Sequence, residues 1–239
     1  MVVMEFANVV NYAINTEKLS RAHREEPSSW KWNMKDVLTQ IERLGKSFDP
    51  SFVIDNDNKF LYRNIVLWLM GDKGFQCIDP KTGAIRNGRI DKGLYIAGNV
   101  GTGKSTAMRI VSRLYRLNPF KLSSGKCYPW VTVSANMVPG TYERYGDAAL
   151  VDLMRRPLLC IEDLGSEDKE AVYMGNRRNV FRKILEYRGD ELTSATMVTS
   201  NIPLGHPNFA EMYGQRAQSR CFEMMNYLVL KGDDRRRCK

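Results

Sequence analysis

Residues 93–105 have the sequence GLYIAGNVGTGKS, and this stretch decides the fold. Its last eight residues match the pattern G-x-x-x-x-G-K-[S/T] in full. The glycines let the backbone curl so that several N–H groups point at phosphate oxygens, and a helix that begins at the loop adds the positive end of its dipole. Lys104 supplies a mobile charge for the β- and γ-phosphates, and the hydroxyl of Ser105 is a ligand for Mg²⁺.

The segments on both sides of the loop support this interpretation over an ordinary glycine turn. GLYIAG (93–98) predicts a buried strand, and an apolar stripe after the loop predicts a helix on residues Ala107, Ile110, Val111, Leu114 and Tyr115. A strand, a glycine loop and a helix are the context that a phosphate site requires. We therefore expect ATP and Mg²⁺ to be bound by the residues Gly98, Asn99, Val100, Gly101, Thr102, Gly103, Lys104, Ser105 and Thr106.

Strand and helix patterns alternate along the rest of the chain. Further strands are predicted at WVTVSA (130–135), PLLCI (157–161), ATMVTSN (195–201) and YLVLKG (227–232). Between them, residues 139–155 mix helix and loop, Val180, Phe181, Ile184 and Leu185 form a helical stripe, and a helix extends to about Met225. Alternation of this kind predicts an α/β fold, with a mostly parallel sheet flanked by helices.

The first 75 residues have a different pattern, in which helical spacing dominates. Apolar residues recur at this spacing over 6–14, 37–44 and 61–69, and EEPSSW (25–30) is typical of a linker. We expect a small helical region at 1–75, followed by an ATPase domain at 76–239.

Composition narrows the class of protein. The net charge of +9 favours a polyanionic partner such as nucleic acid, although a merely soluble basic protein remains an alternative. The five cysteines are scattered and form no CxxC pair, so we do not expect a zinc site. Their odd number and scatter are typical of a protein in the reducing cytosol. We find no signal-peptide pattern, and the longest apolar run, at 65–70, is too short to span a bilayer. We expect a cytoplasmic protein without a membrane partner.

Two carboxylates follow the apolar residues of the strand at 157–161. Glu162 and Asp163 should lie at the carboxyl end of that strand, where ligands bind in open α/β sheets. One would hold Mg²⁺ together with Ser105, and the other would orient or deprotonate the attacking water. The alternative is a solvated acidic turn.

A polar strand end is also found in ATMVTSN, whose last residues are Thr199, Ser200 and Asn201. A side chain there could contact the γ-phosphate or the attacking water. Serine and asparagine also favour helix caps and turns, which is the competing interpretation.

Four segments in this order resemble the DnaC/DnaI/IstB group of AAA+ ATPases, which load replicative helicases or assist transposases. The segments are GNVGTGKS (98–105), LLCIEDLGSE (158–167), ILEYRGDELTSATMVTSNIP (184–203) and YGQRAQSRCFEMMNYLVLKGDDRR (213–236). The resemblance covers roughly residues 90–237 and does not extend to the first 75 residues.

The resemblance implies roles for single residues. Glu162 and Asp163 fall on the Walker B pair, and Asn201 falls on sensor 1. Arg216 and Arg220 fall on the arginines of the family's YGxRxxSR segment, and one of them should be the finger that reaches the ATP of a neighbouring subunit. We expect Arg220 in preference to Arg216; a surface arginine in a weak ion pair is the alternative for each.

Two departures from the family pattern stand out. The acidic pair has glutamate first and aspartate second, the reverse of the usual order, so hydrolysis should be slow or the two roles exchanged. The sequence after LKGDDRR (230–236) leaves no room for the C-terminal helical lid of many AAA+ proteins, as is typical of this group.

The resemblance implies an ATP-dependent replication accessory protein that delivers a replicative helicase to single-stranded DNA and self-associates into an arc or ring. The alternatives are an IstB-like transposition helper with a transposase partner, a P-loop small-molecule kinase, and a scaffold that binds ATP without hydrolysing it. The variable N-terminal region would hold the client, where Trp30 and Trp32 could stack on a base or pack in a core. The basic residues Arg235, Arg236, Arg237 and Lys239 could touch phosphates or form a solubilising tail.

Overall fold

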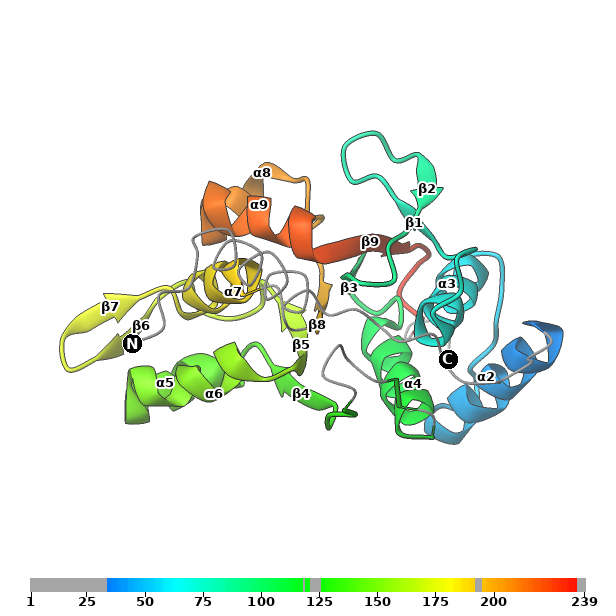
Figure 1. Cartoon of the computed structure of the whole chain (residues 1–239), viewed down its shortest axis with the longest axis horizontal. Coiled ribbons are helices and arrows are strands. Elements are labelled where there is room, and N and C mark those ends of the chain that lie inside the picture. Colours follow the sequence, from blue (N-terminus) through cyan, green and yellow to red (C-terminus); the bar gives the residue numbers. More distant parts are fainter. Residues whose placement is uncertain (1–33, 118, 121–125, 192–194, 236–239) are drawn as a thin grey trace, which may run out of the picture.

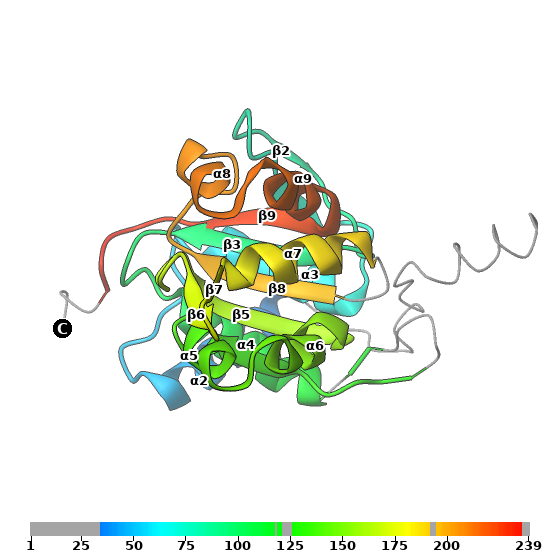
Figure 2. The same ribbon diagram turned by 90° about the vertical axis from the view of Figure 1, so that its left-hand side faces the viewer.

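A five-stranded parallel sheet lies at the centre of the protein, in the strand order β4-β5-β8-β3-β9. The computed structural model describes the chain apart from residues 1–33, 118, 121–125, 192–194 and 236–239. The sheet strands are β3 (Gly93–Gly98), β4 (Val131–Ser134), β5 (Leu158–Leu164), β8 (Ala195–Ser200) and β9 (Met225–Leu230). The predicted α/β class with a parallel sheet is therefore confirmed. Because every pairing in this sheet is parallel, the carboxyl ends of the five strands lie at one edge, and Figure 2 shows β3 and β9 ending on the same side.

Helices cover both faces of the sheet (Figure 1). Both faces are apolar, and strand β3 illustrates this. Because side chains alternate along a strand, Leu94 and Ile96 belong to the apolar cluster on one face, and Tyr95 and Ala97 belong to the cluster on the other face. The first face carries α2 (Met34–Phe48), α3 (Lys59–Met70) and α4 (Lys104–Leu117). The second carries α5 (Met137–Tyr145), α6 (Asp147–Arg155), α7 (Val180–Asp190), α8 (Pro207–Tyr213) and α9 (Gln215–Met224).

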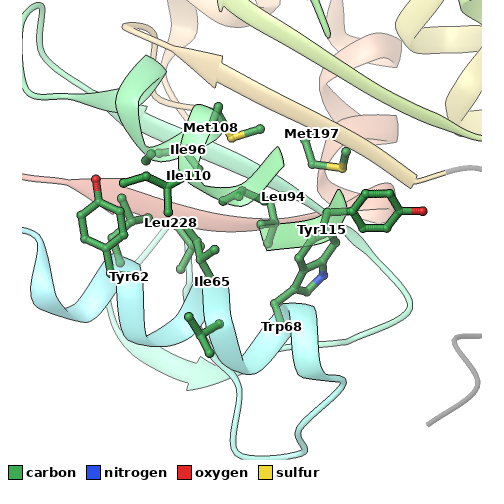
Figure 3. Packing of buried hydrophobic residues seen from close by; sticks show 14 of the residues in the cluster. Tyr62, Ile65, Trp68, Leu94, Ile96, Met108, Ile110, Tyr115, Met197 and Leu228 are labelled. Atoms are coloured by element: carbon green, nitrogen blue, oxygen red, sulfur yellow. The ribbon is translucent and has the colours of Figure 1, made fainter. Parts of the chain in front are cut away.

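Helices α2 and α3 share one core with the sheet. Val37 of α2 and Ile65 and Trp68 of α3 belong to the same buried cluster as Ile110 of α4 and Leu228 of β9, and Figure 3 shows the α3 side chains directed at β3 and α4. The indole Nε1 of Trp68 also donates a 2.7 Å hydrogen bond to the carbonyl of Lys92. The described part of the first 75 residues is thus packed on the sheet, and the domain boundary at residue 75 stays a prediction.

Arg188 ties the second helical layer to the sheet. This α7 side chain is 1% exposed, and its guanidinium donates to the carbonyls of Leu153, Met154 and Arg156 at the end of α6. It also donates to the carbonyl of Ala195 and, at 2.8 Å, to Thr196 Oγ1 in β8. Burial lowers the pKa of Arg188 to about 9, and the five acceptors compensate for its lost hydration.

Local details differ from the sequence patterns. Residues 137–155 are two helices separated by Gly146, rather than a mixture of helix and loop, and the single helix expected before residue 225 is divided at Gly214 into α8 and α9. Both glycines have positive φ, which ends a helix at little cost. Two short hairpins were not predicted: β1 (Gln76–Ile78) with β2 (Ile85–Asn87), and β6 (Ala171–Tyr173) with β7 (Asn176–Arg178).

Some predictions fall outside the described residues: the helix at 6–14, the EEPSSW linker, Trp30 and Trp32, and the basic residues 236, 237 and 239. In the part of the chain that the structure describes, no helix is long and apolar enough to cross a bilayer.

Candidate nucleotide site

The phosphate loop lies where the sequence predicts it, between the end of β3 and the start of α4 at Lys104. Gly101 and Gly103 have φ values of 78° and 102°, a region that residues with a Cβ rarely adopt. The hydroxyl of Thr102 donates a 2.9 Å hydrogen bond to the carbonyl of Asn99, which closes the loop from within. The 14-residue helix α4 places the positive end of its dipole at the loop.

Lys104 connects the loop to the end of β8. Its ammonium donates to the carbonyls of Gly98 and Asn99, each at 2.8 Å, and to Oδ1 of Asn201 at 2.6 Å. The side chain is buried at 5% exposure, so its charge is supported by these dipoles rather than by water. Because β8 pairs with β3 on one side and with β5 on the other, Asn201 lies beside the phosphate loop.

The acidic pair ends β5 at an irregular position. The register between β5 and β8 shifts between Ile161 and Leu164, and Asp163 has a φ of 56°, rare for a residue with a side chain. The amide of Asp163 donates to Thr199 Oγ1 at 2.9 Å, which holds this backbone in place. Asp163 lines the cavity described below, whereas Glu162 is not among the described residues that line it.

Glu162 is half-buried, and its environment favours the protonated form. Burial raises the pKa of Glu162, and the charge of Asp163 raises it further, while Arg109 on α4 opposes the shift. A carboxyl with a raised pKa is suited to accepting a proton.

The polar end of β8 has mixed roles. Thr199 and Ser200 are fully buried, and Ser200 Oγ donates to the carbonyl of Leu164 at 2.6 Å while it accepts from the amide of Ile202 at 2.9 Å. These two residues hold the strand ends together. Asn201 alone of the three lines the cavity.

A cavity of about 790 Å³ opens over the phosphate loop. One side is formed by Val100 to Thr106 with Asn136, Asp163, Ser166 and Asn201. The opposite side comes from the end of α2, the connection between α2 and α3, and the first turn of α3; its lining residues are Phe48, Asp49, Ser51, Phe52, Val53, Asp55, Asp57, Asn58 and Tyr62. Asp233 and Arg235, after β9, complete the wall. No local motif marks residues 48–62 or Asp233 as part of the site, whereas Arg235 is one of the basic residues for which the sequence leaves a phosphate contact open.

The donor set fits Mg²⁺. Ser105 and Asp163 line one cavity, and hydroxyl and carboxylate oxygens are the ligands that Mg²⁺ takes together with phosphate oxygens. Groups of three or more His, Cys, Asp or Glu side chains able to hold a metal are absent from the described residues. A magnesium ion shared with a nucleotide does not need such a group, because it keeps several waters.

Arg216 and Arg220 lie on α9, and both contact Asp190 at the end of α7. Arg216 Nη2 is 2.9 Å from Asp190 Oδ2, and Arg220 Nη2 is 2.5 Å from Oδ1. Arg220 is also 2.9 Å from Glu223. Neither arginine is among the described residues that line the cavity of their own chain.

Glu167 is a buried carboxylate that the sequence patterns missed. It is 8% exposed, and it accepts hydrogen bonds from the amide of Gly165 at 2.8 Å and from the hydroxyl of Tyr213 at 2.5 Å. Burial raises the pKa of Glu167 in spite of these hydrogen bonds. The sequence does place Glu167 four residues after Asp163, beyond the glycine turn at Gly165. Its burial could not be predicted, because its partner Tyr213 is distant in sequence.

Comparisons with known proteins rest on structure. No protein-family model matches the chain, and no curated protein matches its sequence. The crystal structure of the DnaC helicase loader matches with a TM-score of 0.51 and 19% identity, over 77% of this chain and 95% of that chain. A putative primosome component from Streptococcus pyogenes serotype M3 matches with a TM-score of 0.47 and 18% identity, over 77% and 85%. AMPPCP-bound DnaA from Aquifex aeolicus matches with a TM-score of 0.49 and 17% identity, over 79% of this chain and 51% of that chain. The chain therefore has the α/β fold of the DnaC helicase loader.

Proposed function

We propose that this protein is a magnesium-dependent ATPase whose triphosphate is held by Gly98 to Thr106. The observation that carries the proposal is the 2.6 Å hydrogen bond between Lys104 and Asn201, in a cavity that Ser105 and Asp163 also line. A lysine, an amide, a hydroxyl and a carboxylate around a phosphate loop are the groups that phosphoryl transfer to water requires.

Each of these residues has a proposed task. The loop amides and Lys104 bind the phosphates, and Ser105 with Asp163 holds Mg²⁺, which when bound neutralises charge on the phosphates. Asn201 orients the attacking water or the γ-phosphate. Glu162, whose pKa is raised by burial, accepts the proton of that water through one intervening water, because its side chain does not line the cavity. This division exchanges the roles within the acidic pair, and it is supported by the position of Asp163 in the cavity wall.

The arginines act on a neighbouring subunit. Arg216 and Arg220 share Asp190 on the surface of α9 and α7, so a second copy can offer a phosphate in place of that carboxylate. We propose Arg220 as the finger and Arg216 as its support, in an arc or ring that ATP stabilises.

The proposed client is a replicative helicase, delivered to single-stranded DNA. The likeness of fold to the DnaC helicase loader and the net charge of +9 support this role. Residues 1–75 would hold the client. Because residues 48–62 of that region line the cavity, client binding and ATP binding share a wall.

The test is a pull-down against the replicative helicase of the host, with and without ATP, using wild type and Lys104→Ala. We expect ATP-dependent retention that Lys104→Ala abolishes together with ATP binding. Lys169→Ala is the matched control, because Lys169 is exposed, lies outside residues 1–75 and does not line the cavity. Retention of a transposase and preference for duplex DNA would support the transposition helper instead. ATP binding by Lys104→Ala at wild-type affinity would refute the assignment of the site.

A further inference from the structure

The chain segment after β9 runs along the phosphate loop. Strands β3 and β9 pair up to Gly98 and Leu230, so the two segments leave the same edge of the sheet side by side (Figure 2). The amide of Arg235 donates a 3.1 Å hydrogen bond to the carbonyl of Gly101. A Cβ on Gly101 would lie only 1.8 Å from Oδ1 of Asp234. The segment is therefore in close contact with the loop that binds the phosphates.

The side chain of Arg235 crosses the cavity from the loop to the opposite wall. Its Cδ lies 3.9 Å from a Cβ placed on Gly103, and its Nη2 is 2.8 Å and 3.0 Å from the two carboxylate oxygens of Asp55. Both members of this ion pair line the cavity and are partly exposed. The guanidinium thus lies between the phosphate side of the cavity and the side formed by residues 48–62.

The charges around the cavity explain why this cation matters. Five aspartates line it, namely Asp49, Asp55, Asp57, Asp163 and Asp233, against three cations, Lys104, Arg109 and Arg235. A polyanionic triphosphate that enters such a cavity is repelled unless the cations contact it. A guanidinium binds phosphate oxygens through two parallel hydrogen bonds, which a carboxylate such as Asp55 occupies equally well.

We propose that Arg235 is a nucleotide-binding residue, which exchanges the carboxylate of Asp55 for a phosphate oxygen of the bound nucleotide. Asp55 is left in contact with water, which costs little because its side chain is 37% exposed. This inference rests on the proposed ATP site, and for Arg235 it favours a phosphate contact over a solubilising tail, the two alternatives that the sequence left open.

The experiment is an equilibrium titration of wild type and variants with a fluorescent ATP analogue and Mg²⁺, with unlabelled ATP as competitor. We expect Arg235→Ala to weaken binding about 10- to 100-fold, the effect of losing a charge-assisted hydrogen-bonded contact. Asp55→Asn should bind as tightly as wild type or more tightly, because it releases the guanidinium. Arg86→Ala is the matched control, since Arg86 forms an exposed ion pair with Asp79 away from the cavity.

Wild-type affinity in Arg235→Ala would overturn the proposal. Equal weakening by Arg235→Ala and Asp55→Asn would also overturn it, because the ion pair would then act only by holding the wall. Failure of the ATP site itself has a different signature: wild type does not bind the analogue, or Lys104→Ala binds it equally well. Thermal unfolding of each variant verifies that the changes in affinity arise in folded protein.

Discussion

The hydroxyl of Tyr213 donates a 2.5 Å hydrogen bond to Oε1 of Glu167, at a buried point between the acidic turn after β5 and the end of α8. The other oxygen of Glu167 accepts from Gly165 in that turn. Tyr213 lies three residues before Arg216, so the pair joins the acidic side of the site to the segment that carries the arginines.

Tyr213→Phe should destabilise the protein by about 1–3 kcal/mol, because it leaves a buried carboxylate without one of its donors. Urea unfolding followed by circular dichroism measures the change. Tyr145→Phe is the control, as Tyr145 is exposed on α5. A variant as stable as wild type would show that water replaces the missing hydroxyl.

Glu167→Gln should change the pH dependence of stability. The pKa of Glu167 is raised above its ordinary value of 4.5, so its favourable contribution is present below that pH and is lost as pH rises through the folded-state pKa. Stability of the Gln variant should therefore fall less than that of wild type as the pH rises above about 4.5. Unfolding free energies across this range, with exposed Glu170→Gln as control, decide the matter. Parallel curves for all three proteins would contradict the prediction.

Arg188→Met should cost about 3 kcal/mol or more, because several buried carbonyls lose their donor at once. Arg188→Lys should recover only part of this, since an ammonium cannot reproduce the planar fork that spans α6 and β8. Arg156→Ala, which breaks an exposed pair with Asp152, should cost less than about 1 kcal/mol. Thermal unfolding compares the three, and a small loss in Arg188→Met would mean that apolar packing suffices at this position.

Asp163→Asn should reduce ATP turnover about 100-fold or more. It should also raise the Mg²⁺ concentration needed for half-maximal turnover, because Mg²⁺ loses a carboxylate ligand while Ser105 and the phosphates remain. Glu162→Gln should lower turnover without changing the Mg²⁺ requirement, because Glu162 does not line the cavity with Ser105. Steady-state phosphate release at several Mg²⁺ concentrations separates the two effects. The reverse pattern would restore the usual order of roles in the acidic pair.

Arg220→Ala should keep ATP affinity and lose turnover, since the arginine acts on the site of a neighbour. Mixing equal amounts of Arg220→Ala and Lys104→Ala subunits should restore roughly a quarter of wild-type turnover, because random head-to-tail pairing joins an intact site to an intact arginine at that frequency. Arg182→Ala is the control, since Arg182 is an exposed arginine that pairs with Glu186 within α7. No recovery on mixing would place the function of Arg220 within its own subunit.

Local patterns predicted the parts of the site that are contiguous in sequence. The phosphate loop follows GLYIAG directly, and Asp163 and Asn201 each end an apolar run, so strand and helix periodicity sufficed to place them at one edge. Which of these residues contact one another could not be predicted from the local patterns. Insertion of β8 between β3 and β5 brings Asn201 to Lys104, and this order is set by packing of whole strands rather than by any one segment.

Glu167 and Arg235 are residues whose contacts could not be predicted from the sequence. Their partners, Tyr213 and Asp55, are distant in sequence, and a carboxylate or an arginine in a polar stretch is indistinguishable from a solvated one until the contact is known. The short hairpins were also not predicted, because strands of three residues are too short to show the alternation of apolar and polar side chains.

The contact between Gly101 and Asp234 has a consequence for the order in which the protein is made. The phosphate loop leaves the ribosome before strand β9, which pairs with β3, and before the segment that touches Gly101 and Asp55. A growing chain therefore carries the loop without its neighbour in the sheet and without one wall of the cavity. Nascent protein should therefore acquire its full nucleotide affinity only after residues 225–235 have been added.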